Sequence, residues 1–284
     1  MISASSLTFS YRKSAVPAIQ NLSFEVQQGE IFGFLGPSGA GKSTTQKILI
    51  GLLTGYSGSV SVFGRPLKEW KSEYYERIGV SFEFPNHFLK LSALENLAYF
   101  SKLYQGKTVP PEKLLGMVGL GGDGAVPVGQ YSKGMKNRLS VARSILHTPE
   151  LLFLDEPTAG LDPVNARHIK DLIRAQRNAG ATVFLTTHDM TVADELCDRV
   201  AFLVGGSIAV IDRPRELKIR HGQSKVRVES DGAGGTNRQE FSLEGLGEDT
   251  EFLNILRVGK IQTIHSMEAT LEDVFIKVTG RGLQ

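Results

Sequence analysis

The architecture of this chain follows from one run of residues, Ile31-Phe32-Gly33-Phe34-Leu35-Gly36-Pro37-Ser38-Gly39-Ala40-Gly41-Lys42-Ser43. A short apolar strand enters a glycine-rich turn that fits the pattern G-x-x-x-x-G-K-[ST], and helical residues follow from Lys42 to Leu53. In this context the pattern predicts a loop whose backbone N–H groups turn inward around the phosphates of a nucleotide, because glycines allow that turn. A glycine-rich strand-to-helix turn without a ligand is the alternative.

The residue types in this loop indicate what it would bind. The Lys42 ammonium group can reach the β- and γ-phosphates, and the Ser43 hydroxyl can ligate Mg²⁺. We therefore expect the turn to cradle a nucleotide together with its metal ion. The expected nucleotide contacts are Gly36, Pro37, Ser38, Gly39, Ala40, Gly41, Lys42, Ser43 and Thr44.

Composition narrows the class of protein. The chain has 284 residues, 41% of them hydrophobic and 22% charged, which is ordinary for a globular protein of one large domain, or one large and one small. A net charge of +2 gives no reason to expect a nucleic-acid partner. We expect no signal peptide at the start, and no apolar run approaches the roughly 20 residues that span a bilayer. If the protein works at a membrane, another chain would supply the spans.

Hydrophobic patterns predict the layout of the core. Alternating apolar and polar residues at 7–11 and 22–26 predict antiparallel strands, and 59–63 predicts another strand. Helical spacing dominates from 91 to 145, which indicates a helical insertion. Strands alternate with helices again from 151 to 211, and this alternation predicts a mainly parallel sheet covered on both faces. The predicted fold is therefore α/β, a P-loop NTPase core with an antiparallel β subdomain.

A break in the pattern at Arg213 to Gly222, where the composition turns basic, predicts a domain boundary. We place an ATP-binding type of domain at 1–215, with its helical subdomain at about 89–147, and a small C-terminal α+β domain at 222–284. The expected elements of the small domain are strands at 225–229 and 240–243 around the glycine-rich turn 232–235, a helix at 251–258, a strand at 261–264 and a helix at 271–278.

Chemistry-bearing residues end two apolar strands. Asp155 and Glu156 follow the strand Leu151–Leu154; the first can hold Mg²⁺ directly or through water, and the second can polarise an attacking water as a general base. A pair of solvated acids that open a turn is the alternative. His188 follows the strand Thr182–Thr187, where it could contact a γ-phosphate, or be a turn histidine without a role.

A second loop suited to an anion is Tyr131-Ser132-Lys133-Gly134-Met135, ahead of the helical residues 136–147. A small hydroxyl residue and a glycine at a helix N-terminus present free backbone N–H groups to a phosphate. Since the loop lies far in sequence from Gly36 to Ser43, it raises the question of which nucleotide it serves.

Together these segments resemble the ATP-binding subunit of ABC transporters in order and spacing. The resemblance covers about residues 1 to 215. It is specific because P-loop kinases and GTPases lack the second phosphate-contacting motif and the terminal histidine. The segments that carry it are Gly36–Ser43, Tyr131–Arg138, Leu151–Pro157, Gly160-Leu161-Asp162-Pro163 and His188.

The resemblance implies roles for residues that contact ATP within one copy. Tyr11 would stack on the adenine, while Lys42 and Ser43 would contact the phosphates and Mg²⁺. Asp155 would be the acid linked to Mg²⁺, and Glu156 would be the catalytic base.

Other matching residues imply a second copy. Ser132 and Gly134 would contact the γ-phosphate of the ATP bound by the partner copy, and Asp162 would belong to a loop that communicates across this dimer. His188 resembles the switch histidine that senses the γ-phosphate and takes part in catalysis.

Two departures from the family pattern are present. The second loop reads Tyr-Ser-Lys-Gly-Met where the family usually has Leu-Ser-Gly-Gly-Gln, a variant that resembles drug- and polysaccharide-exporting subunits. Glu83 stands where the family has a glutamine that touches Mg²⁺ and the attacking water; the carboxylate could still ligate Mg²⁺ but adds negative charge beside the γ-phosphate. A harmless substitution is the alternative. With Phe84-Pro85-Asn86 after it, this stretch resembles subunits of antibiotic exporters, fluoroquinolone exporters among them.

The tail Ala269–Phe275 resembles the C-terminal tail of the same exporter group. Leu271, Val274 and Phe275 recur at helical spacing, and we expect them in the core of the small domain rather than at a partner surface.

The resemblance therefore implies an ATPase subunit of an exporter, bound to the cytoplasmic face of a prokaryotic cell membrane. Two copies would close head to tail around two ATP molecules and push on separate transmembrane permease subunits through the region near Phe84 to Leu97. The rival is a soluble ABC-type ATPase of translation or DNA maintenance, which usually has two nucleotide domains or a long coiled coil in one chain. A non-hydrolysing regulatory module is disfavoured because Lys42, Asp155 and Glu156 are all present. The transported substance is not encoded in these motifs.

Overall fold

The computed structural model describes residues 1–12, 14, 16–222, 225–232 and 235–280. It divides into two compact units between Arg213 and Pro214. The sequence placed the end of the first domain at residue 215 and missed a helix, α7 (Pro214–His221), which belongs to the second unit.

A six-stranded sheet forms the centre of the first unit, in the order β10-β9-β3-β8-β7-β6. All neighbours in it are parallel except β10, which pairs antiparallel with β9 through the turn Gly205-Gly206. Every residue of β3, β7 and β8 is buried, as expected for parallel strands covered on both faces. The strands are β3 (Ile31–Leu35), β6 (Ile78–Ser81), β7 (Leu151–Asp155), β8 (Thr182–Thr187), β9 (Arg199–Val204) and β10 (Ser207–Asp212).

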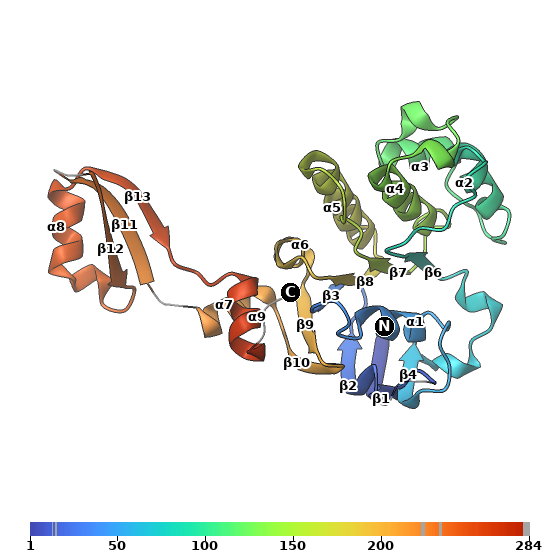
Figure 1. The fold of residues 1–284 in the computed structure, drawn as a ribbon, viewed down its shortest axis with the longest axis horizontal. Helices are drawn as coiled ribbons and strands as arrows, with labels where there is room; N and C mark the ends of the chain where they lie inside the picture. Colours follow the sequence, from blue (N-terminus) through green and yellow to red (C-terminus); the bar gives the residue numbers. More distant parts are fainter. Residues whose placement is uncertain (13, 15, 223–224, 233–234, 281–284) are drawn as a thin grey trace. The chain divides into compact units, whose positions relative to one another are not determined.

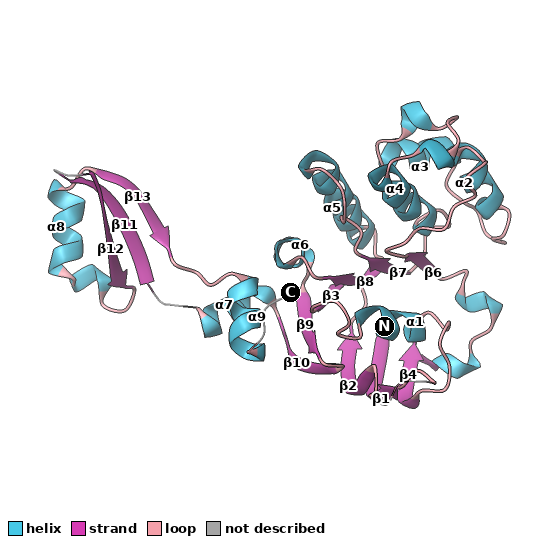
Figure 2. Cartoon of the chain, viewed as in Figure 1, coloured by secondary structure: helices cyan, strands magenta, loops and turns pink. Residues whose placement is uncertain are grey.

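Helices cover both faces of this sheet. Figure 1 shows α5 (Pro163–Asn178) and α6 (Met190–Leu196) on one side and α1 (Lys42–Leu49) on the other. Cys197 ends α6 and is buried, as expected for a small hydrophobic side chain. This arrangement confirms the predicted α/β class, and Figure 2 shows the alternation of strands and helices along the core.

A second, antiparallel sheet packs on the α1 side, in the order β2-β1-β4-β5. Its inward side chains meet those of the central sheet in one core. At the centre of that core the Phe184 ring has its centroid 5.4–6.2 Å from the rings of Phe24, Phe32, Phe34 and Phe153. The strands are β1 (Ile2–Phe9), β2 (Ile19–Val26), β4 (Ser57–Val62) and β5 (Arg65–Pro66).

The helical insertion holds α2 (Ala93–Ser101), α3 (Pro111–Met117) and α4 (Lys133–Ser144). A capping box between Ser92 and Glu95 begins α2, and a proline at the first position begins α3. The insertion packs closely on the core at Gly79, where an added Cβ atom would lie 1.9 Å from the Ser144 carbonyl oxygen. Short 3-10 helices connect these regions: η1 (Leu67–Glu69), η2 (Ser72–Tyr74), η3 (Gly121–Asp123) and η4 (Val128–Gln130).

The second unit contains α7 packed on α9 (Leu271–Thr279) and a three-stranded antiparallel sheet in the order β12-β11-β13. Leu271, Val274 and Phe275 are all buried. The glycine-rich turn predicted at 232–235 falls partly on residues 233 and 234, which lie outside the described residues. The remaining elements are β11 (Lys225–Gly232), β12 (Gly235–Ser242), η5 (Leu246–Glu248), α8 (Thr250–Val258) and β13 (Ile261–Ser266).

The central position of Phe184 predicts the cost of removing its ring. Phe184→Ala should lower the free energy of unfolding of the first unit by about 3–5 kcal/mol, because the change leaves a cavity among four aromatic neighbours. Trp70 is the only tryptophan of the chain, so its fluorescence in a urea titration reports on this unit alone. The control is Leu103→Ala, at a side chain that is 60% exposed. Equal unfolding midpoints for the two variants would contradict the assigned core.

Candidate functional site

A cavity of about 440 Å³ lies where β3, β7 and β8 end, and it collects most of the residues singled out from the sequence. The carboxyl ends of parallel strands meet at one edge of a sheet, which is where open α/β sheets bind ligands. The lining residues are Tyr11, Ala18, Ser38, Gly39, Gly41, Lys42, Ser43, Thr44, Glu83, Asp155, Glu156 and His188.

The loop after β3 needs its glycines. Gly39 and Gly41 have φ values of 78° and 106°, in the left-handed region that other residues rarely adopt. A Cβ atom at Gly36 would lie 2.2 Å from the Leu203 carbonyl oxygen of β9. The glycines therefore let the loop turn tightly against the sheet and begin α1 at Lys42.

Lys42 closes this loop from within. Its ammonium group donates hydrogen bonds to the carbonyl oxygens of Gly36, at 2.6 Å, and Pro37, at 3.0 Å. Burial lowers the pKa of this group, and the negative charges of the nearby acids Glu156, Asp155 and Glu83 oppose that shift. Lys42 is thus a buried cation that is hydrogen-bonded to carbonyl oxygens, which the oxygens of a bound anion could replace.

Ser43 and Asp155 meet although they are far apart in sequence. The Ser43 hydroxyl donates a hydrogen bond of 3.2 Å to one carboxylate oxygen of Asp155, and the Thr186 hydroxyl donates to the other. Burial raises the pKa of Asp155, while the hydrogen bonds from Thr186 and Ser43 lower it. A hydroxyl and a carboxylate in contact form a hard oxygen pair of the kind that Mg²⁺ prefers.

Glu156 is held by the end of the neighbouring strand. Its carboxylate accepts hydrogen bonds from the Thr187 hydroxyl at 2.9 Å and from His188, through the backbone N–H at 2.9 Å and ring Nδ1 at 2.6 Å. Glu156 has a φ of 48°, a sparsely populated conformation for a residue other than glycine that concentrates at functional sites. The acid and the histidine, separated in sequence, therefore form one unit.

Tyr11 and Glu83 complete the rim. Tyr11 is 43% exposed, its hydroxyl lies 3.2 Å from Thr44 Oγ1, and its ring packs edge-on against Phe9. Glu83 follows β6 and faces the same cavity from the side of the helical insertion.

Ser132, Gly134 and Asp162 do not line this cavity. Ser132 begins α4 by accepting a 3.1 Å hydrogen bond from the Met135 N–H, and Asp162 begins α5 by accepting from the N–H groups of Val164 and Asn165. Hydrogen bonding by Asn165 holds the pKa of Asp162 below its usual value. Ser132 and Asp162 are therefore helix N-caps. A role in binding or catalysis would require them to contact a ligand outside this cavity.

Three polar residues of the site were missed from the sequence. Thr186 and Thr187 donate to the two acids, and the Gln46 side-chain oxygen accepts a 3.2 Å hydrogen bond from Thr186. The Thr186-Thr187 pair before His188 could have been predicted from the sequence, because hydroxyl groups at a buried strand end can donate hydrogen bonds to neighbouring carboxylates. Gln46 had no local signal, since it lies within a helix.

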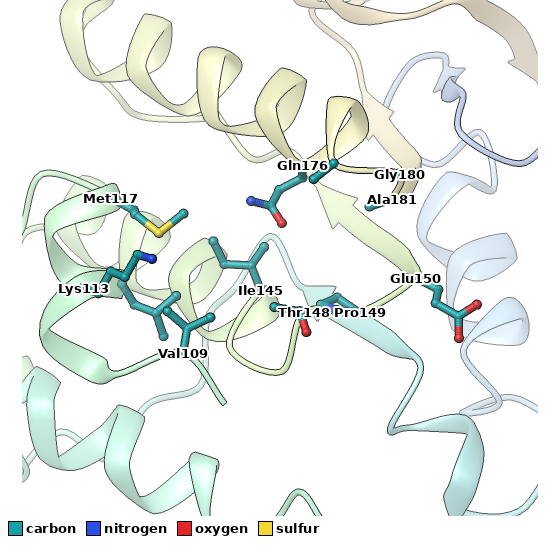
Figure 3. Close-up of a pocket in the computed structure, with 12 residues that line it drawn as sticks. Val109, Lys113, Met117, Ile145, Thr148, Pro149, Glu150, Gln176, Gly180 and Ala181 are labelled. Atoms are coloured by element: carbon teal, nitrogen blue, oxygen red, sulfur yellow. The ribbon is translucent and has the colours of Figure 1, made fainter. Parts of the chain in front are cut away.

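A second cavity, of about 350 Å³, lies between α3, the turn from α4 to β7 and the end of α5 (Figure 3). None of the residues predicted for the site lines it. No helix within the described ranges is both long and apolar enough to cross a membrane.

Comparisons with known proteins agree with this geometry. Residues 19–159 match the family model "ABC transporter", and residues 224–268 match the "Fluoroquinolone efflux ABC transporter C-terminal domain". The chain is 57% identical to a fluoroquinolones export ATP-binding protein of Mycobacterium tuberculosis, over 98% of this chain and 92% of that protein. It is 35% identical to the Nod factor export ATP-binding protein I of Neorhizobium galegae, over 100% of this chain and 86% of that protein.

Solved structures agree as well. An ATP-binding subunit of an ABC transporter matches with a TM-score of 0.70 and 26% identity, over 78% of this chain and 92% of that one. A dimeric bacterial ABC transporter cassette matches with a TM-score of 0.69 and 26% identity, over 75% of this chain and 98% of that one. These matches confirm the predicted resemblance and favour it over the alternative of a soluble ABC-type ATPase of translation or DNA maintenance. The chain belongs to the ABC transporter family, among its export ATP-binding proteins.

Proposed function

We propose that this subunit hydrolyses ATP, as a head-to-tail pair of copies, to drive export through separate membrane subunits. One observation carries the proposal. A single cavity brings together the buried Lys42, a Ser43–Asp155 pair and a Glu156–His188 pair. The second loop suited to an anion, at Ser132 to Gly134, lies outside this cavity at the start of α4.

The cavity suits ATP with Mg²⁺. Phosphate oxygens would replace the carbonyl partners of Lys42, and the loop from Gly36 to Gly41 would supply backbone N–H groups. Ser43 and Asp155 would hold Mg²⁺, which neutralises phosphate charge during the reaction, with Glu83 as a further oxygen donor at the rim. Burial raises the pKa of Asp155 because its charged form is poorly solvated, and a bound cation would favour that form.

Glu156 is placed to act as the base. It would accept a proton from the water that attacks the γ-phosphorus, while the bond from that phosphorus to the bridging oxygen breaks and ADP leaves. The Nδ1 contact from His188 would orient the carboxylate, and the remaining ring nitrogen, on a side chain that is 60% exposed, would face the γ-phosphate. Tyr11, exposed at the rim, would stack on the adenine.

The position of Ser132 and Gly134 supports the second copy. The N-terminus of α4 carries free backbone N–H groups but faces no phosphate of its own cavity. A partner's γ-phosphate would meet them in a head-to-tail pair, and the dimeric form of a similar cassette supports such a pairing. Asp162 lies on the loop beside α4, which the 2.7 Å hydrogen bond from Asn137 to the Ala159 carbonyl ties to that helix.

Exposed apolar side chains indicate where a membrane partner would bind. Phe84 is 72% exposed, Leu89 55% and Phe88 45%, close to the ring of Tyr99. Apolar side chains grouped on a surface mark interaction sites. The segment is tied to α4, since His87 contacts the Lys136 carbonyl at 3.0 Å and Arg143 donates to the Asn86 carbonyl at 2.7 Å. A push on the membrane subunits would therefore be coupled to the helix that carries Ser132.

The relatives support a proposal for the cargo class. The similarity to a fluoroquinolones export protein, together with the matching C-terminal domain, supports a drug or another amphipathic compound as the exported substance. The subunit would lie on the cytoplasmic face of a bacterial membrane, where ATP is supplied, and its 222–284 region would act as an accessory domain.

Glu156→Gln tests the base. The variant should still bind ATP and pair, because the amide keeps the shape of the side chain, but kcat should fall about 100-fold or more. Phosphate release and sizing by light scattering with ATP and Mg²⁺ measure both effects. Glu112→Gln, at an exposed position of α3, makes the same chemical change away from the site. Unchanged hydrolysis in Glu156→Gln would remove Glu156 from this role.

Glu83→Gln tests the unusual acid. If its negative charge slows attack beside the γ-phosphate, turnover should rise by a few fold in the amide variant, with a higher Mg²⁺ requirement. Steady-state kinetics over a Mg²⁺ titration separate the two effects. A clear fall in kcat would show instead that the site depends on the carboxylate.

Ser132→Asp tests the shared site without removing the helix cap. Aspartate caps a helix as well as serine does, but it would place a negative charge against the partner's γ-phosphate. ATPase activity should fall at least tenfold, and the neutral capping variant Ser132→Asn should lose less. Mixing Ser132→Asp with Lys42→Ala should restore part of the activity, since one composite site in the mixed pair is intact. Full activity of Ser132→Asp alone would mean that each copy is complete by itself.

A further inference from the structure

A third cavity, of about 360 Å³, lies at the far end of α1 from the nucleotide site. It shares no lining residue with the nucleotide cavity in the described part of the chain. One wall is the segment that follows α1, and the other is formed by η1 and η2. The lining residues are Gly51, Leu53, Thr54, Tyr56, Leu67, Lys68, Trp70, Lys71, Tyr74 and Tyr75.

Aromatic rings line this cavity in defined positions. The Trp70 ring N–H donates to the Val62 carbonyl at 3.1 Å, and the Tyr74 hydroxyl donates to the Leu49 carbonyl at 2.7 Å. Their centroids lie 5.6 Å apart with an interplanar angle of 35°. Tyr74 is only 2% exposed and forms the floor of the cavity, while Trp70 is half-buried with the Arg65 guanidinium over its ring, 4.8 Å from the centroid. Tyr75, 47% exposed, adds a ring at the rim.

Two cations stand at the same rim without a carboxylate partner among the residues that the structure describes. Lys68 and Lys71 are exposed and form no ion pair with any described residue. The neighbouring acids are engaged elsewhere, since Arg65 pairs with both Glu69, at 3.7 Å, and Glu73, at 3.1 Å. The Lys68 ammonium group lies 5.0 Å from the centroid of the Tyr56 ring. The rim is therefore positive above an aromatic floor.

The cavity of Figure 3 differs from this one in the chemistry of its lining. Its lining contains no aromatic side chain, and one of its charged residues, Glu150, is already paired with Arg77 at 2.6 Å. Cavity size alone does not distinguish the two, but their chemistry does.

We propose that the cavity at the end of α1 binds a planar aromatic anion. Its rings would pack against Trp70 and Tyr75, and its negative group would pair with Lys68 and Lys71. A volume of about 360 Å³ lies within the range of small-molecule sites.

Two matched probes test the proposal with the full chain. Anilinonaphthalenesulfonate is an aromatic anion, and N-phenylnaphthylamine has the same rings without the sulfonate. Both absorb where tryptophan emits, so energy transfer from Trp70, the only tryptophan, reports binding in its neighbourhood, and the lysine variants below assign the signal to this cavity. We expect saturable energy transfer from the anion, tighter than from the neutral probe by about tenfold, and not displaced by saturating ATP.

Variants assign the effect to the two lysines. Lys68→Gln with Lys71→Gln should weaken the anionic probe about tenfold and leave the neutral probe within about twofold. The control pair Lys102→Gln with Lys107→Gln removes the same charge at exposed positions of the helical insertion and should change neither affinity. Four outcomes would each overturn the proposal. The double variant of Lys68 and Lys71 could lose affinity equally for both probes, or keep its affinity for the anionic probe. ATP could displace the anionic probe, or no energy transfer could be seen at all.

Discussion

The hydrogen bonds between the ends of β7 and β8 are the interaction on which the site depends. Parallel pairing sets Asp155 beside Thr186, and the hydroxyls of Thr186 and Thr187 then donate to the two adjacent acids. Two carboxylates at the edge of an apolar sheet would be costly without such donors. The same strand end supplies His188, so one pairing of strands brings together Asp155, proposed to hold Mg²⁺, Glu156, the proposed base, and His188.

A second dependence runs through α4. Its N-terminus holds the loop that would meet the partner copy, while its sides contact the exposed segment after β6 and the loop before α5. Burial lowers the pKa of His87 to about 4, so this histidine stays neutral at physiological pH and its contact with the Lys136 carbonyl does not vary there. The close approach of Gly79 to Ser144 fastens the end of the same helix to β6. The exposed segment after β6 is therefore connected to the helix that begins at Ser132 by side-chain hydrogen bonds to backbone carbonyl groups, together with this close packing.

Much of the fold and site could be predicted because the decisive signals are local. The loop from Gly36 to Ser43 reveals itself through glycines that its own backbone angles require. Runs of apolar and β-branched residues at 151–154 and 182–187 are recognisable as buried strands without knowledge of their neighbours. Strand β6 and helix α7 were missed because their local sequence patterns are weak. The strand Ile78–Ser81 is short and the helix Pro214–His221 is strongly basic, so tertiary packing outweighs their weak local patterns.

The sequence by itself determined the α/β class and the family, and it singled out the glycine-rich loop from Gly36 to Ser43, the two acids and the histidine as candidates for the site. Only the tertiary structure decided which of these residues meet. Ser43 and Asp155 are 112 positions apart, and Lys42 faces Asp155, Glu156 and Glu83 across the cavity. It also decided that Ser132 and Asp162 cap helices outside that cavity, and that rings and lysines converge at the far end of α1. The physical reason is that local patterns encode backbone conformation and burial, whereas the order of strands and the packing of helices bring distant side chains within hydrogen-bonding reach.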